Sequence, residues 1–369
     1  MTGPVAGVYL DTSRDIDDPD RAVELRWRQL RRALEAEGAD SATLAALEGM
    51  VGADREVDGR HGQALFAAGG EPVLARVLPR PPGRDTARYG RTPDAMPLAV
   101  RHAPDIAYLA VLIGRERLPE SGSREPAATA SPDEEDTVVA YLQAGRWPMS
   151  AVAPRPVASY GFPVDQWQRA AGRVTDAAGE LARVHHAEVV VVWAQRDDAW
   201  SRGVFVNRLS PGLRDRLITV EGETLPHAAP GRALLEERLA SLLDGRLGER
   251  DRAQVDRYLA QRARDAEASE GLAATVGAAQ RGQVQALLVN EEHGLAARRL
   301  WAGPGPGQLA LSREELDAFG VPSAHEEPAD SLLVRAAVGT GAELIVVPSE
   351  EVSLADGTGV LLRYGAVTP

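Results

Sequence analysis

A run of four valines and a tryptophan at residues 189–193 is the feature that most constrains the fold. An uninterrupted β-branched run of this kind is typical of a central parallel strand that is covered on both faces. Ahead of this run, five apolar residues recur at the spacing of an amphipathic helix: Trp167, Ala171, Val174, Ala178 and Leu181. A long helix followed by a buried strand predicts an α/β fold in which helices pack on a mixed sheet.

The chain of 369 residues is long enough for two or three domains. Its patterns predict three: an N-terminal α+β domain over 1–103, a middle domain over 104–227 and a C-terminal domain over 228–369. In the first domain, Asp18 and Pro19 predict a helix start, because aspartate caps helices and proline favours the first helical position. Residues 118–136 and 145–161 show no such periodicity and are expected to be irregular. Two long helices are expected over 231–244 and 249–268.

Cysteine and lysine are both absent, so all 41 basic residues are arginines. This composition excludes cysteine nucleophiles, Cys-ligated zinc sites, P-loop phosphate binding by lysine and lysine Schiff bases. The net charge of −13 argues against indiscriminate coating of nucleic acid, although it leaves room for local arginine contacts. Residues 228–369 hold 14 arginines against 21 acidic residues, a balance that favours a protein partner. No apolar run approaches the roughly 20 residues that span a bilayer, and a cytoplasmic protein without a secretory signal is expected.

Candidate metal ligands and catalytic groups have simpler explanations. Asp15, Asp17, Asp18 and Asp20 lack the EF-hand spacing and are better explained by helix capping and by the helix dipole. His185 and His186 are adjacent, so they point about 100° apart on a helix and cannot act as an i, i+4 zinc pair. The glycine-rich segments at 303–307 and 339–341 lack the context of a dinucleotide site and are expected to be turns. We therefore predict no metal, no cofactor and no catalytic constellation.

Two stretches in the last third carry a family resemblance. Residues 270–289 combine a glycine-led helix, a short Arg-Gly turn and a Leu-Leu-Val strand, and residues 357–364 combine a glycine-rich approach with a Leu-Arg-Tyr strand. In this order they resemble the third domain of the archaeo-eukaryotic peptide-chain release factor and Pelota superfamily. The opening residues 3–13, with the arginine-rich helix behind them, resemble its bacterial branch, which includes the Balon-type ribosome hibernation factors of high-GC bacteria. The resemblance implies three domains, with a mixed-sheet middle domain and a ribosomal-protein-like α/β/α C-terminal domain.

The chain departs from release factors at their hydrolytic and decoding motifs. Release factors carry a Gly-Gly-Gln tip in the middle domain, whereas the corresponding residues 146–168 contain none. Two partial matches, at residues 61–63 and 281–283, lie in the wrong domains. The lysine-containing decoding motif of the eukaryotic factors is impossible in a chain without lysine. The resemblance therefore implies binding rather than turnover.

On this basis, the resemblance implies a hibernation or stress factor that occupies the A site of idle ribosomes without decoding stop codons. The arginines on the polar face of the first helix, Arg28, Arg31 and Arg32, would contact rRNA phosphates; a solvated helix face is an equal alternative. A loop that contains Arg155, Tyr160 and Phe162 would stack on unpaired bases, with packing inside the domain as its alternative. Relatives suggest that the acidic C-terminal domain meets elongation factor Tu.

Two other functions stay open at the level of sequence. A divergent peptidyl-tRNA hydrolase would use Gln166 or Gln168 in place of the missing tip glutamine. A stress protein that keeps the fold but acts away from the ribosome is the third possibility.

Overall fold

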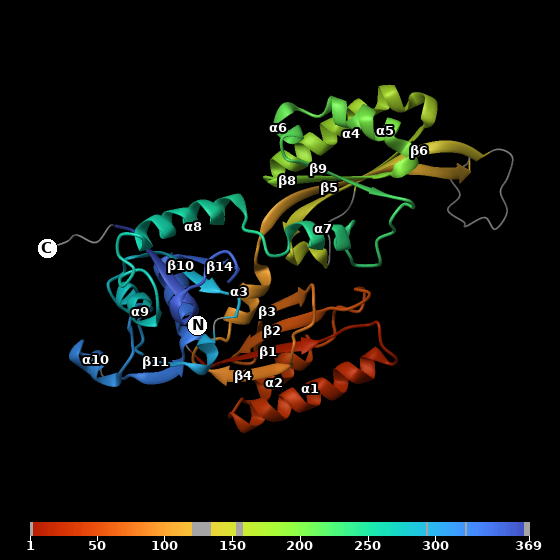
Figure 1. Cartoon of the computed structure of the whole chain (residues 1–369). Coiled ribbons are helices and arrows are strands. Elements are labelled where there is room, and N and C mark those ends of the chain that lie inside the picture. Colours follow the sequence, from red (N-terminus) through yellow and green to blue (C-terminus); the bar gives the residue numbers. More distant parts are fainter. Residues whose placement is uncertain (1–2, 120–133, 153–157, 293, 322, 365–369) are drawn as a thin grey trace. The chain divides into compact units, whose positions relative to one another are not determined.

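The computed structural model describes residues 3–119, 134–152, 158–292, 294–321 and 323–364 (Figure 1). The chain forms two compact units. Unit 1 comprises Met1–Arg55, Gly59–Pro104 and Gly245–Pro369, and unit 2 comprises Glu56–Asp58 and Asp105–Asp244. The domain boundaries that the sequence suggests near 104 and 228 stay a prediction. The two units are defined by compactness, and they group the first and last segments of the chain together. In the described ranges, no helix combines the length and apolar character that crossing a membrane requires.

An antiparallel sheet of order β3-β2-β1-β4 begins unit 1. Its strands are β1 (Val5–Asp11), β2 (Gly62–Ala68), β3 (Glu71–Leu78) and β4 (Thr86–Gly90). Helices α1 (Pro19–Ala36) and α2 (Ser41–Glu48) cover one face of this sheet with apolar side chains (Figure 1). The helix start predicted from the sequence is confirmed: the Asp18 carboxylate accepts a hydrogen bond from the backbone N–H of Arg21.

The second sheet of unit 1 has the order β14-β10-β15, with β10 parallel to β14 and antiparallel to β15. Its strands are β10 (Val284–Asn290), β14 (Glu343–Val347) and β15 (Thr358–Leu362). Helix α8 (Glu249–Arg262) packs on one face, and α9 (Leu272–Gln280) and α11 (Ala329–Thr340) pack on the other. Side chains of β10 alternate between these faces, so Leu287 and Leu288 lie in different cores. This is the α/β/α arrangement that the resemblance implies.

Unit 1 also contains short elements that the sequence patterns do not predict. They are α3 (Met96–His102), α10 (Arg313–Ala318) and the small sheet of β11 (Arg299–Ala302), β12 (Leu309–Ala310) and β13 (His325–Pro328). Strands of two to four residues are too short to show an alternating pattern. The glycine-rich segment 303–307 connects β11 to β12, as expected of a turn.

Unit 2 contains a mixed sheet of order β7-β6-β5-β8-β9. Its strands are β5 (Ile106–Pro119), β6 (Glu134–Trp147), β7 (Ala158–Pro163), β8 (Val189–Gln195) and β9 (Leu217–Gly222). Strand β8 lies between β5 and β9 and is parallel to both. The valine run therefore forms the central parallel strand that the sequence predicts.

Helices cover both faces of this sheet (Figure 1). Helices α4 (Val164–Val184) and α5 (Ala199–Arg208) pack on one face, and α7 (Glu236–Leu243) packs on the other. The short helix α6 (Pro211–Arg214) leads into β9. Trp167 is fully buried in α4 and donates a hydrogen bond from Nε1 to the backbone oxygen of Ser201 at 3.0 Å.

Two segments expected to be irregular are partly strand. Strand β5 continues to Pro119 and β6 starts at Glu134, while residues 120–133 lie outside the described ranges. Strand β6 also continues to Trp147, and β7 then adds an edge strand from Ala158. The pairing of β5 with β6 over fourteen register positions extends these strands beyond their apolar residues, because backbone hydrogen bonds do not require an apolar side chain.

Two helices are shorter than expected. Helix α7 begins at Glu236 rather than near 231, because Gly231 and Leu235 have φ angles of 68° and 57°, which an α-helix does not accept. Helix α8 ends at Arg262. Beyond it, the Asp265 carboxylate accepts a hydrogen bond from the backbone N–H of Ala268 at 3.1 Å, a local contact that competes with helix formation.

Candidate nucleic-acid interface

Two of the three predicted arginines on α1 are paired with carboxylates. Arg28 donates a 2.6 Å hydrogen bond to Glu24, and Arg31 contacts Glu35 at 3.0 Å and Glu48 at 2.8 Å. Hydrogen bonding to Glu35, together with the charge of Glu48, raises the pKa of the Arg31 guanidinium. These pairs are exposed and therefore weak, so a phosphate can take the place of the carboxylate at little cost.

The third arginine, Arg32, differs from its neighbours. It is exposed and makes no ion pair within the described residues. Within the described residues, no carboxylate therefore offsets its charge at short range. The opposite face of α1 packs on the sheet through the apolar side chains predicted for it: Val23, Trp27, Leu30 and Leu34.

Tyr160 and Phe162 belong to the edge strand β7, which corrects the expectation that they lie in a loop. They are alternate residues on one side of the strand, and their rings stack with centroids 6.4 Å apart at 14°. The Phe162 ring also lies 6.3 Å from that of Trp167, and the Arg173 guanidinium lies 5.6 Å from the Phe162 centroid. Both rings are half-buried against the core under α4. Arg155, predicted beside them, lies outside the described residues.

The two glutamines of the hydrolase alternative lie in the first turns of α4. The side chains of Gln166 and Gln168 are exposed, and neither makes a hydrogen bond within the described part of the chain. The backbone oxygen of Gln168 accepts a hydrogen bond from Arg208. Within the described residues, neither glutamine side chain is therefore hydrogen-bonded to a group that could act as an acid, a base or an oxyanion donor.

The partial matches to the hydrolytic tip have structural roles. His61 is fully buried, with Nε2 3.1 Å from the Asp54 carboxylate, and Gln63 accepts a hydrogen bond from the backbone N–H of Gly52 at 2.9 Å. At the other match, Gln283 accepts a local hydrogen bond from Arg281 at 2.8 Å. The buried side chains of residues 61–63 cannot reach a substrate.

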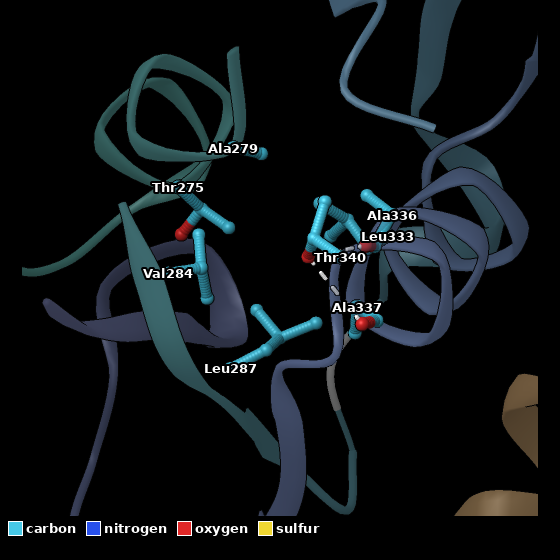
Figure 2. A pocket seen from close by; sticks show the side chains of 8 residues that line it. All are labelled: Thr275, Ala279, Val284, Leu287, Leu333, Ala336, Ala337 and Thr340. Atoms are coloured by element: carbon cyan, nitrogen blue, oxygen red, sulfur yellow. Dashed lines mark hydrogen bonds between the residues drawn. The ribbon is translucent and has the colours of Figure 1, made fainter. Parts of the chain in front are cut away.

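The pocket between α9, β10 and α11 is too small for a ligand. Apolar side chains and two threonines surround it, and Figure 2 shows Leu287 and Leu333 pointing into the gap from β10 and α11. Its volume is about 10 Å³, which is the size of one water molecule. Within the described ranges, no three His, Asp or Glu residues are grouped so that they could hold a metal ion.

Three further arginines are not singled out by any sequence pattern. Arg208, Arg214 and Arg216 lie between the end of α5 and the start of β9, and each donates to backbone carbonyl oxygens rather than to a carboxylate. Their density, three arginines within residues 208–216, is the only signal that the sequence offers.

The two stretches that carry the family resemblance lie side by side in unit 1. Strands β10 and β15 pair antiparallel, and Glu270 forms an isolated bridge with Gly359. The backbone N–H of Gly271 donates to the backbone oxygen of Thr358 at 2.9 Å, and the buried hydroxyls of Thr275 and Thr358 are 3.3 Å apart. The two stretches therefore form one continuous part of the same sheet and its flanking helix.

Residues 124–264 match the model of the bacterial archaeo-eukaryotic release factor family 2. Over this segment the chain is similar to the bacterial branch of the archaeo-eukaryotic release factors. The matched segment contains most of unit 2, including β6, β7, α4 and β8. The half-buried aromatic pair of β7 and the exposed glutamines of α4 therefore lie in residues 124–264, here called the release factor segment.

Similar proteins are known from sequence and from structure. The uncharacterized protein Rv2629 of Mycobacterium tuberculosis (strain H37Rv) is 27% identical over 380 residues, which cover 99% of this chain and 94% of the relative. Pelota of Archaeoglobus fulgidus is 14% identical, with a TM-score of 0.36 over 84% of this chain and 80% of that chain. Archaeal Pelota in a model of its ribosome-bound complex with ABCE1 is 12% identical, with a TM-score of 0.36 over 99% of this chain and 91% of that chain.

Proposed function

We propose that the chain is a hibernation or stress factor that occupies the A site of idle ribosomes and does not decode stop codons. The similarity of residues 124–264 to a release factor family supports a ribosome-associated function. The observation that carries the finer proposal is that the release factor segment, residues 124–264, contains no Gly-Gly-Gln. A scaffold of this family without its hydrolytic tip is suited to occupying a site rather than to releasing a peptide.

In this proposal, rRNA is contacted at two places. On α1, Arg32 binds a phosphate directly, and Arg28 and Arg31 exchange their exposed carboxylate partners for phosphates. On β7, the outer surfaces of Tyr160 and Phe162 stack on unpaired bases, and Arg155 belongs to the same contact. The half-burial of both rings supports the second contact, because rings held by a core stack on a base with little loss of side-chain entropy.

We propose elongation factor Tu as the protein partner of the C-terminal segment. Helix α10 presents three exposed acidic side chains, those of Glu314, Glu315 and Asp317, and the cation of Arg313 offsets only part of this charge. An acidic helix face of this kind complements a basic surface and raises the association rate at low salt. Replacing Glu314 and Glu315 by glutamine tests the contact, since loss of binding to purified elongation factor Tu with retained ribosome binding supports it.

The second candidate function is a peptidyl-tRNA hydrolase. The exposed side chains of Gln166 and Gln168 support it, because a glutamine that positions water must be free to reach the ester. Release of labelled peptide from stalled ribosome complexes tests this candidate. Release that is lost in Gln166→Ala or Gln168→Ala would replace the hibernation proposal, while no release from the unaltered chain removes the hydrolase.

Sedimentation of lysate from starved cells tests ribosome occupancy. The hibernation proposal predicts that the chain co-sediments with ribosomes after starvation, and that high salt releases it, because contacts to phosphates are salt-dependent. Its complete absence from the ribosomal fractions would contradict the proposal.

A further inference from the structure

Unit 2 contains a pocket of about 230 Å³ that none of the predicted sites includes. It lies between the C-terminal half of α4 and the segment that leads from α5 to β9. Leu213 and four small residues make up most of its wall: Gly179, Ala182, Ser210 and Gly212. The guanidinium groups of Arg183 and Arg216 border it. Small side chains let a ligand approach the backbone closely, and the arginines determine the charge that the pocket accepts.

Arg216 and its two neighbours are held in place without being neutralised. Arg216 donates to the backbone oxygen of Ala187 at 2.8 Å, Arg214 donates to the backbone oxygen of Leu209 at 3.0 Å, and Arg208 donates to that of Gln168. No ion pair involves these three arginines within the described ranges. A guanidinium has five N–H donors, so each group keeps both its full charge and free donors.

The acidic groups nearby offset only one arginine. Glu180 makes two hydrogen bonds to Arg183, of 3.0 and 2.6 Å, and hydrogen bonding to Arg183 lowers the pKa of the Glu180 carboxyl. Both side chains are exposed, so this pair is weak and can be exchanged for another anion. Asp215 is exposed and makes no ion pair in the described residues. Unpaired carbonyl oxygens at the end of a helix would repel an anion. The backbone oxygen of Ala182, near the end of α4, is paired, because it accepts a hydrogen bond from the backbone N–H of Ala187 at 2.9 Å.

We infer that this pocket binds a phosphate group of an RNA backbone, and that Arg208 and Arg214 bind neighbouring phosphates of the same strand. The arginines contact α4 and its end from Gln168 to Ala187. From Gln168 to the end of α4 at Val184, a rise of 1.5 Å per helical residue gives roughly 24 Å, which is the length of several nucleotides. No aromatic side chain lines the pocket, so it offers no ring on which the base of a free nucleotide would stack. The identity of the RNA as ribosomal rests on the proposed function.

Binding of a fluorescently labelled RNA hairpin to the purified full chain, measured by anisotropy over a series of salt concentrations, tests the inference. Arg216→Ala and Arg214→Ala should each weaken binding several-fold and lower the slope of log K against log salt by about 1. Glu180→Gln should strengthen binding, because it removes the carboxylate that pairs with Arg183. Both side chains are exposed, so this substitution leaves the core unchanged. Arg238→Ala is the matched control, since Arg238 is an exposed arginine on α7, which packs on the other face of the sheet.

Three results would overturn the inference. The first is unchanged affinity and salt slope in Arg214→Ala, Arg216→Ala and Glu180→Gln when all three variants keep the circular dichroism of the unaltered chain. The second is an equal loss in Arg238→Ala. The third is competition by inorganic phosphate or ATP as effective as that by unlabelled RNA at equal phosphate concentration, which would indicate a small anion as the ligand.

Pelleting of the same variants with ribosomes separates this inference from the proposed function. If the unaltered chain pellets with ribosomes and the arginine variants pellet equally, the pocket inference fails and the function stands. If the unaltered chain binds the hairpin through these arginines but does not pellet with ribosomes, the function fails and the pocket stands.

Discussion

Arg88 on β4 donates a hydrogen bond of 2.6 Å to Glu327 on β13, a residue 239 positions further along the chain. A second nitrogen of Arg88 donates to the hydroxyl of Ser331 on α11 at 2.8 Å. Both charged side chains are largely buried, with 22% of Arg88 and 11% of Glu327 exposed. This contact connects the first and last segments of the sequence within unit 1.

Removing the cation of this pair should destabilise unit 1. We expect Arg88→Ala to lower the free energy of unfolding by about 2–3 kcal/mol, because it leaves the Glu327 carboxylate buried without its partner. Denaturant unfolding followed by circular dichroism measures the change. Arg28→Ala, which removes an exposed pair, should change the same quantity by less than about 0.5 kcal/mol. Equal effects of the two substitutions would contradict this account of unit 1.

The pH dependence of stability should report on Asp94. Burial, together with the charge of Asp330, raises the pKa of Asp94 from 3.8 to about 6. The folded state therefore favours the protonated acid, so the contribution of Asp94 to stability is fully present below about pH 4 and is lost as pH rises through 6. Asp94→Asn should match the unaltered chain at low pH and exceed it by about 3 kcal/mol above pH 7. A stability difference that does not vary with pH would show that Asp94 titrates normally.

The buried carboxylate of Asp54 and its partner His61 should respond strongly to truncation. The Asp54 carboxylate accepts a hydrogen bond from the Thr12 hydroxyl at 2.7 Å and lies 3.1 Å from Nε2 of the fully buried His61. His61→Ala should cost about 3 kcal/mol, because it removes the partner of a buried carboxylate. In a double-mutant cycle with Asp54→Ala, the combined loss should be smaller than the sum of the single losses. Strict additivity would mean that the two side chains do not interact.

The aromatic pair of β7 has a packing role and a proposed binding role, and the two can be separated. Phe162→Ala should lower the stability of unit 2 by about 2 kcal/mol, since it removes part of the core under α4. Tyr160→Leu keeps apolar packing but loses the ring, so it should leave thermal unfolding nearly unchanged and weaken binding to single-stranded RNA several-fold. Unchanged RNA binding in Tyr160→Leu would leave packing as the role of this ring.

The elements that the sequence predicts well are those in which one strong local signal agrees with the tertiary contacts. The valine run becomes β8 because it is buried on both faces, and Asp18 caps α1 because capping needs only neighbouring residues. The edge strand that holds Tyr160 and Phe162 was not predictable in the same way. Its six residues include a glycine and a proline, and pairing with β6 determines its conformation.

The candidate interface was predictable only in part, because charge counts do not reveal pairing. The i, i+4 spacing of Glu24 with Arg28 is visible in the sequence, whereas the contact between Arg31 and Glu48 depends on how α1 packs beside α2. Arg216 shows the converse, since its partner is a backbone oxygen that no sequence pattern identifies. Structure thus separates arginines that are offset by carboxylates from those that keep their charge.

Competition for the ribosomal A site tests the central claim most directly. Purified chain is pelleted with vacant ribosomes in the presence of increasing amounts of an A-site tRNA. The proposal predicts that the chain pellets with vacant ribosomes, that A-site tRNA displaces it, and that a tRNA restricted to the P site does not. No pelleting, or pelleting that A-site tRNA leaves unchanged, would contradict the proposal.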